Sequence, residues 1–92
     1  MKLLILEDED TKFDEIEKYI HEVIGIDCSI QREKNWFDYS KAIISTRFDL
    51  ILLDLLVPRS PRDSTIEDHH ESLVSTTRDY SSKSFSTPTI VL

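Results

Sequence analysis

The sequence predicts an α/β fold with a doubly wound parallel sheet. Two short apolar runs, Lys2–Leu6 and Leu50–Leu53, are each followed at once by acidic residues. Strands that are apolar on both faces are typical of a parallel sheet covered by helices on both sides. Segments with helical spacing alternate with the expected strands, an order that implies right-handed crossovers. A run as short as Leu50–Leu53 also fits a buried helix segment, but its length and the nearby Pro58 favour a strand.

The first helix is expected from about Thr11 to Ile24, because apolar residues recur there at helical spacing. Thr11 with Asp14 forms a weak capping box, and Gly25 lies where a residue of positive φ ends a helix. The residues of the apolar stripe are Phe13, Ile16, Ile20, Val23 and Ile24.

A short strand and a second helix are expected next. Ile26, Cys28 and Ile30 alternate with polar residues, which indicates a strand. Asn35–Ser45 predicts a helix with Asn35 as its N-cap. The residues available to pack it are Trp36, Phe37, Tyr39, Ala42 and Ile43.

The segment after the central strand is less regular. Pro58–Asp63 is a turn-rich loop that contains Arg59 and Arg62. These two arginines either assist an anionic substrate or are exposed loop charges. Ser64 with Glu67 forms a capping box that predicts a polar third helix from about Thr65 to Asp79. His69 and His70 are adjacent, point in different directions on a helix, and so chelate a metal poorly. Pro88–Leu92 is the expected fourth strand.

Composition places the chain among small soluble proteins. Its 92 residues allow one domain, and 39% hydrophobic with 32% charged residues is ordinary for a globular protein. A net charge of −7 argues against direct nucleic-acid binding and against docking on anionic membranes. No apolar run approaches a membrane span, no signal peptide is evident, and the lone Cys28 fits a reducing cytoplasm. We therefore expect a cytoplasmic location.

The candidate site lies at the ends of the two apolar runs. Glu7–Asp10 follow the first run and Asp54 follows Leu53. Ligand crevices in open α/β sheets form at the carboxyl ends of the strands, so three or four carboxylates would share a small space. Close carboxylates disfavour each other's ionisation. An all-oxygen cluster open to water therefore suits Mg²⁺.

These segments resemble a known family. Lys2–Asp8 and Phe48–Pro58 are similar to the first and third strands of the bacterial two-component response-regulator receiver domain, and Ser86–Leu92 is similar to the entry to its fourth strand. The resemblance implies a single receiver domain over residues 1–92, with a CheY-like, flavodoxin-like sheet of order 2-1-3-4-5. Here that sheet would be incomplete and would end after the fourth strand.

The resemblance also implies a function in phosphorelay signal transduction. Asp54 matches the phosphoacceptor, which takes a phosphoryl group from a histidine kinase or phosphotransfer protein. Mg²⁺ would be held by Glu7, Asp8, Asp54 and the backbone carbonyl of Leu56. The chain would then be a phosphoprotein and not an enzyme, with self-catalysed phosphotransfer as its only catalytic activity.

The sequence departs from the family in ways that leave alternatives open. It stops before the family's switch Ser/Thr and fifth-strand lysine, so it is either a fragment of a longer receiver or a naturally shortened one. A degenerate receiver-like interaction module is the alternative function, and a hydrolase is less favoured because no nucleophile–base pair is visible. Thr89–Leu92 would form an open sheet edge, through which we expect a homodimer or a partner protein.

Overall fold

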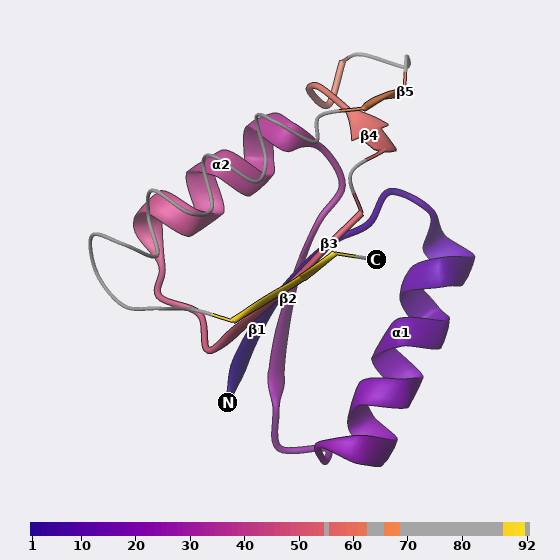
Figure 1. The fold of residues 1–92 in the computed structure, drawn as a ribbon, viewed down its shortest axis with the longest axis vertical. Helices are drawn as coiled ribbons and strands as arrows, with labels where there is room; N and C mark the ends of the chain where they lie inside the picture. The colour runs from indigo at the N-terminus through magenta and orange to yellow at the C-terminus, as the bar shows by residue number, and fades with distance from the viewer. Residues whose placement is uncertain (55, 63–65, 69–87, 92) are drawn as a thin grey trace.

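The computed structural model describes residues 1–54, 56–62, 66–68 and 88–91. Strands and helices alternate along the first half of the chain (Figure 1). The elements in chain order are β1 (Lys2–Leu6), α1 (Asp10–Val23), β2 (Ser29–Glu33), α2 (Trp36–Ser45), β3 (Leu50–Leu53), β4 (Leu56–Pro58), β5 (Ile66–Asp68) and β6 (Thr89–Val91).

The main sheet is parallel and has the strand order β2-β1-β3-β6. In β1, Leu6 lies opposite Glu33 of β2 and Leu53 of β3, and Leu53 in turn lies opposite Val91 of β6. The predicted α/β class, the parallel sheet and the fourth strand in Pro88–Leu92 are confirmed. This order is that of an incomplete CheY-like fold.

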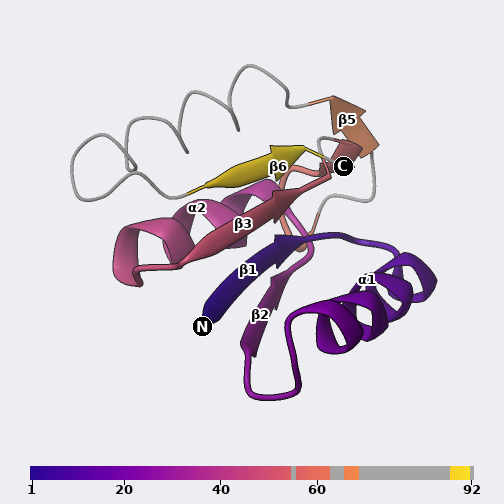
Figure 2. The same ribbon diagram turned by 60° about the horizontal axis from the view of Figure 1, so that its bottom comes forward.

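Helices cover both faces of this sheet, α1 on one side and α2 on the other (Figure 2). Because side chains alternate along a strand, neighbouring residues of the central strands belong to different hydrophobic clusters. The α1 face packs Leu3, Ile5 and Leu52 with Phe13 and Ile20. The α2 face packs Leu4, Leu6, Ile51, Leu53 and Val57 with Phe48, Tyr39, Ala42 and Ile43. The sheet is therefore doubly wound, as predicted.

Helix α1 starts earlier than the capping pattern predicts. Its N-cap is Glu9, whose side chain makes no capping hydrogen bond, and Thr11 lies inside the helix. The predicted Thr11 capping box is therefore wrong, because the acidic run leads directly from β1 into the helix. At the other end Gly25 has φ 122°, as expected for the residue that ends a helix.

Strand β2 starts three residues later than the alternation predicts. Ile26 is 83% exposed and lies in the turn before β2, so the predicted strand start is wrong. The strand begins at Ser29, which pairs with Lys2. The following N-cap is confirmed, because Asn35 Oδ1 accepts a hydrogen bond of 2.8 Å from the Asp38 N–H.

The segment after β3 forms a second, antiparallel sheet of β4 and β5. Val57 of β4 is fully buried in the α2-side cluster, and it fixes this strand to the domain. Ile66–Asp68 pair with Leu56–Pro58, so the predicted helix is wrong for these three residues. Pairing satisfies their backbone groups in place of helical bonds. The rest of the predicted third helix, with His69 and His70, lies outside the described residues.

The last described strand, β6, pairs with β3 on one side. Ile90 and Val91 are 51% and 48% exposed. Within the described strands β6 lies at one border of the main sheet, and β2 lies at the other. Among the described residues no helix has the length and apolar character needed to cross a membrane.

Candidate functional site

The sheet topology brings the ends of β1 and β3 together. At its carboxyl end β1 is followed by α1 on one face of the sheet, and β3 is followed by β4, whose Val57 packs on the α2 face. Connections that diverge in this way are where ligand sites form in open α/β sheets. The Glu7 N–H donates to the Glu33 carbonyl at 3.0 Å, and the Asp54 N–H donates to the Leu6 carbonyl at 2.9 Å. The first residue after each strand is thus held in the hydrogen-bonding pattern of the sheet.

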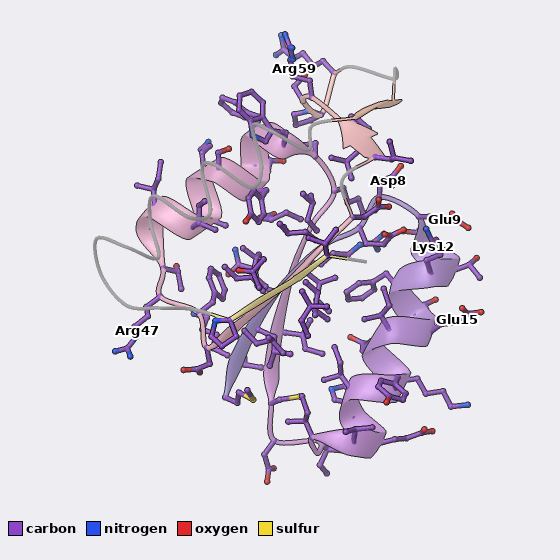
Figure 3. All side chains as sticks on the ribbon, in the orientation of Figure 1. Asp8, Glu9, Lys12, Glu15, Arg47 and Arg59 are labelled. Atoms are coloured by element: carbon purple, nitrogen blue, oxygen red, sulfur yellow. The ribbon has the colours of Figure 1, made fainter. Side chains whose placement is uncertain are left out.

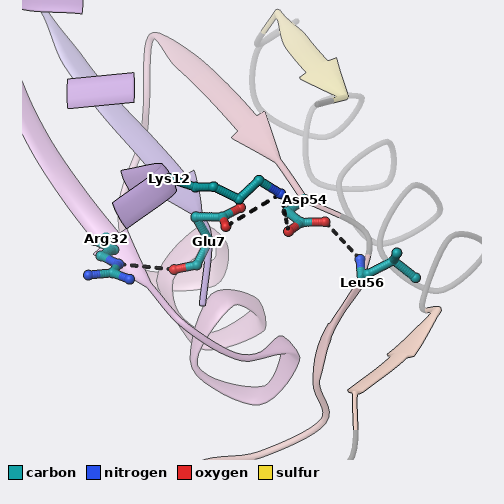
Figure 4. A network of polar contacts seen from close by, with 5 residues as sticks. All are labelled: Glu7, Lys12, Arg32, Asp54 and Leu56. Atoms are coloured by element: carbon teal, nitrogen blue, oxygen red, sulfur yellow. Dashed lines mark hydrogen bonds and ion pairs between the residues drawn. The ribbon is translucent and has the colours of Figure 1, made fainter. Parts of the chain in front are cut away.

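Alternation along the strands then sets which face these side chains take. Ile5 and Leu52 face α1, so residues two positions later take the same side. Those residues are Glu7 and Asp54. Both side chains therefore lie on the α1 face of the sheet, and Figure 4 shows their carboxylates close to each other.

Glu7, Asp8 and Asp54 form the acidic cluster of the domain. One carboxylate oxygen of each residue lies within 4.8 Å of the corresponding oxygens of the other two. Glu7 is buried, while Asp8 and Asp54 are half-buried. The structure thus brings together the three acidic side chains that the sequence assigns to a metal site.

Glu7 is the most constrained member of this cluster. Its side chain is 1% exposed, and no donor among the described residues hydrogen-bonds to either carboxylate oxygen. Burial raises the pKa of Glu7 from its ordinary value of 4.5 to about 7, with hydrogen bonding to Asp54 and the charge of Asp54 acting in the same direction. The nearby Lys12 opposes this shift. A protonated Glu7 can donate to Asp54, whereas two ionised carboxylates repel each other.

The two oxygens of Asp54 have different neighbours. Oδ1 accepts a hydrogen bond of 3.0 Å from the Leu56 N–H, a local turn in which an aspartate side chain binds backbone two residues on. Oδ2 lies 3.9 Å from Lys12 Nζ. The Leu56 N–H therefore fixes the carboxylate orientation. The contact seen at Leu56 involves its N–H, so ligation by its carbonyl stays a prediction.

Lys12 is a member of the site that the sequence interpretation missed. Its Nζ lies 3.9 Å from Glu7 Oε1, the same distance as from Asp54 Oδ2, and its side chain extends between the two carboxylates (Figure 4). The available signal was a lysine within the first turn of a helix that directly follows an acidic run. A cation there is unfavourable to the helix dipole, which points to a local anionic partner.

Arg32 binds a fourth acidic residue, Asp10, away from the cluster. Its Nε donates to the Glu7 carbonyl at 2.9 Å, its Nη1 lies 2.8 Å from Asp10 Oδ1, and its guanidinium lies over the Phe13 ring at 4.5 Å. Hydrogen bonds from Arg32, then Lys34, hold the pKa of Asp10 below its ordinary value. Asp10 is thus paired with these cations and does not join the other three acids.

The other charged candidates lie apart from the cluster. Figure 3 shows Arg59 well away from Asp8, and Glu9 directed away from the sheet. Arg59 and Arg62 are exposed, which agrees with the reading of these arginines as exposed loop charges. A groove of about 540 Å³ borders the cluster at Asp8; its other lining residues are Arg32, Glu33, Lys34, Asn35, Asp38, Pro58, Ser60 and Pro61.

The residues present fit a hard divalent cation. All three side chains offer carboxylate oxygens, the donors that Mg²⁺ prefers. The buried Glu7 oxygens have no hydrogen-bond donor within the described part of the chain, so a cation would satisfy an otherwise costly group. The partly exposed Asp8 and Asp54 leave room for the waters that Mg²⁺ retains.

Comparison with known proteins supports the fold. The structure is similar to a solved structure described as "MaeR response regulator bound to beryllium trifluoride", with a TM-score of 0.66 and 18% sequence identity. The alignment covers 100% of this chain and 66% of that chain. A search of protein-family models and a search of curated proteins give no match. The resemblance to a receiver domain is therefore confirmed at the level of the fold.

Proposed function

We propose that the chain is a phosphoacceptor domain in which Asp54 accepts a phosphoryl group. The observation that carries this proposal is the position of Asp54, oriented by the Leu56 N–H and within 4.8 Å of two further carboxylates. Phosphoryl transfer needs mainly positioning and neutralisation of charge. The site supplies a positioned nucleophile and a set of cation ligands.

The reaction forms one bond and breaks another. A carboxylate oxygen of Asp54 attacks phosphorus, while the bond from phosphorus to the leaving group breaks and its electron pair stays on that group. Glu7, Asp8 and Asp54, with the Leu56 carbonyl, would hold Mg²⁺, which when bound supplies positive charge for the phosphoryl oxygens. No proton is transferred to or from Asp54 in this step, and the Leu56 N–H holds its carboxylate in place.

The partners follow from this chemistry. The donor would be a phosphohistidine on a histidine kinase or phosphotransfer protein, or a small acyl phosphate. Catalysis by the chain would be limited to its own phosphorylation, in a cytoplasmic signalling pathway. The solved MaeR response regulator carries beryllium trifluoride, a group that resembles phosphate. We also propose that the exposed Ile90 and Val91 of β6 form an edge for a second copy or a partner protein.

The test is incubation of the chain with acetyl phosphate and Mg²⁺, followed by measurement of intact mass. We expect wild type to gain the mass of one phosphoryl group and Asp54→Asn to gain none. Asp14→Asn, which removes an exposed aspartate of α1, is the matched control and should behave as wild type. Uptake by Asp54→Asn would contradict the role of Asp54, and no uptake by wild type would favour the degenerate interaction module.

A further inference from the structure

Lys12 occupies an unusual place for a surface lysine. Helix α1 begins at Asp10, so Lys12 lies in its first turn, where the helix dipole disfavours positive charge. Its Nζ nevertheless lies 3.9 Å from both Glu7 Oε1 and Asp54 Oδ2. The carboxylates therefore determine this position, because they compensate for the unfavourable helix end.

We propose that Lys12 is a tethered cation of the phosphoacceptor site, which weakens Mg²⁺ binding and assists the approach of the anionic phosphoryl group to Asp54. The second part of this inference, the assistance to the phosphoryl group, rests on the proposed function. Its first part depends only on the position of the ammonium group beside the acidic cluster.

The effect on Mg²⁺ follows from charge. The ammonium of Lys12 lies close to two of the three carboxylates that would hold the metal, and like charges repel. The Lys12 side chain is 55% exposed, so solvent screens part of this repulsion. We expect removal of the charge to strengthen Mg²⁺ binding by roughly three- to ten-fold.

The effect on the phosphoryl group follows from the same count of charges. With Glu7, Asp8 and Asp54 ionised, Lys12 and one Mg²⁺ bring the cluster to zero net charge, whereas Mg²⁺ alone leaves one negative charge. A neutral site repels an anionic phosphoryl donor less than a negative one. The lysine stem is flexible, so its ammonium can follow the phosphoryl oxygens during transfer. Lys12 moves no proton in this step and acts by charge alone.

The experiment compares Lys12→Met and Lys12→Arg with wild type in the full 92-residue chain. Lys18→Met is the matched control, because Lys18 is exposed further along α1 and its loss changes the net charge equally. Mg²⁺ affinity is measured by titration with MgCl₂ followed by amide chemical shifts. Phosphorylation rate is measured with acetyl phosphate at saturating Mg²⁺, and circular dichroism verifies that each variant is folded.

Two changes of opposite sign are expected in Lys12→Met. Mg²⁺ should bind roughly three- to ten-fold more tightly, while phosphorylation at saturating Mg²⁺ should slow by about ten-fold. Lys12→Arg keeps the charge and should retain most of both properties, and Lys18→Met should match wild type. A merely structural role for Lys12 would weaken metal binding and phosphorylation together.

The outcomes separate the inference from the proposed function. Unchanged or weaker Mg²⁺ binding in Lys12→Met, or an unchanged rate, overturns the inference. A wild-type chain that takes up no phosphoryl group overturns the proposed function. The Mg²⁺ titration then still decides the first part of the inference: tighter binding in Lys12→Met supports it, and equal binding overturns it.

Discussion

The substitution Glu7→Gln tests how much the buried charge of the acidic cluster lowers the free energy of unfolding of the metal-free protein. Glu7 is 1% exposed, and none of the residues that the structure describes donates a hydrogen bond to its oxygens. Glutamine has nearly the same shape, stays neutral at every pH, and resembles the protonated acid in its ability to donate to Asp54. The substitution therefore removes the cost of the buried charge while it preserves the packing.

The magnitude follows from the raised pKa. The native pKa of Glu7 is about 7 and its ordinary value is 4.5, so the native state binds the proton more tightly than the unfolded chain. The contribution of Glu7 to the free energy of unfolding is therefore largest below pH 4.5, falls as the pH rises towards 7, and no longer changes above about pH 7. At about 1.4 kcal/mol for each pKa unit, the loss is about 3 kcal/mol.

We expect Glu7→Gln to be more stable than wild type by about 3 kcal/mol at pH 8 and by less than about 1 kcal/mol at pH 5. The assay is urea denaturation in EDTA at both values, with linear extrapolation to zero denaturant. Burial also raises the pKa of Glu33, so the comparison is between variants at the same pH. Glu15→Gln, which neutralises an exposed acid of α1, is the control. Equal stability of Glu7→Gln and wild type at pH 8 would refute the reasoning.

Three further predictions concern neighbouring residues. Asp54→Asn should lose Mg²⁺ affinity and gain about 1 kcal/mol of metal-free stability by relief of repulsion; titration with unchanged affinity would contradict the site. Arg32→Met should cost about 1–3 kcal/mol in urea denaturation because it leaves the Glu7 carbonyl without its donor, and an effect no larger than that of Lys34→Met would contradict it. Wild type should associate at micromolar concentration in light scattering, and Ile90→Lys should reduce this association, since Ile90 is 51% exposed on β6; a wild-type monomer would contradict it.

Local signals were sufficient for much of the fold. The apolar runs of β1 and β3 and the N-cap at Asn35 could be predicted because neighbouring residues determine them. The meeting of Glu7 with Asp54 also follows from sequence, once the two strands are taken as parallel neighbours. The start of β2 could not be predicted from alternation alone, because pairing with Lys2 sets it.

Tertiary contacts determine what the sequence could not show. Ile66–Asp68 carry a helix-start pattern, yet their pairing with β4 makes them a strand. Asp10 belongs to the acidic run by sequence, yet Arg32 from β2 holds it apart from the other acids. Lys12 reaches the cluster only because α1 starts at Asp10 and lies over the ends of two strands. Each outcome depends on a partner distant in sequence or on an exact helix start.

The most direct test of the phosphoacceptor assignment is to locate the phosphoryl group on the chain. Wild type is treated with acetyl phosphate and Mg²⁺, the acyl phosphate is trapped by borohydride reduction, and the peptides are mapped by mass spectrometry. We expect a single modified residue, Asp54, and no modification in a parallel sample treated with EDTA. Modification of Glu7 or Asp8 in place of Asp54 would contradict it.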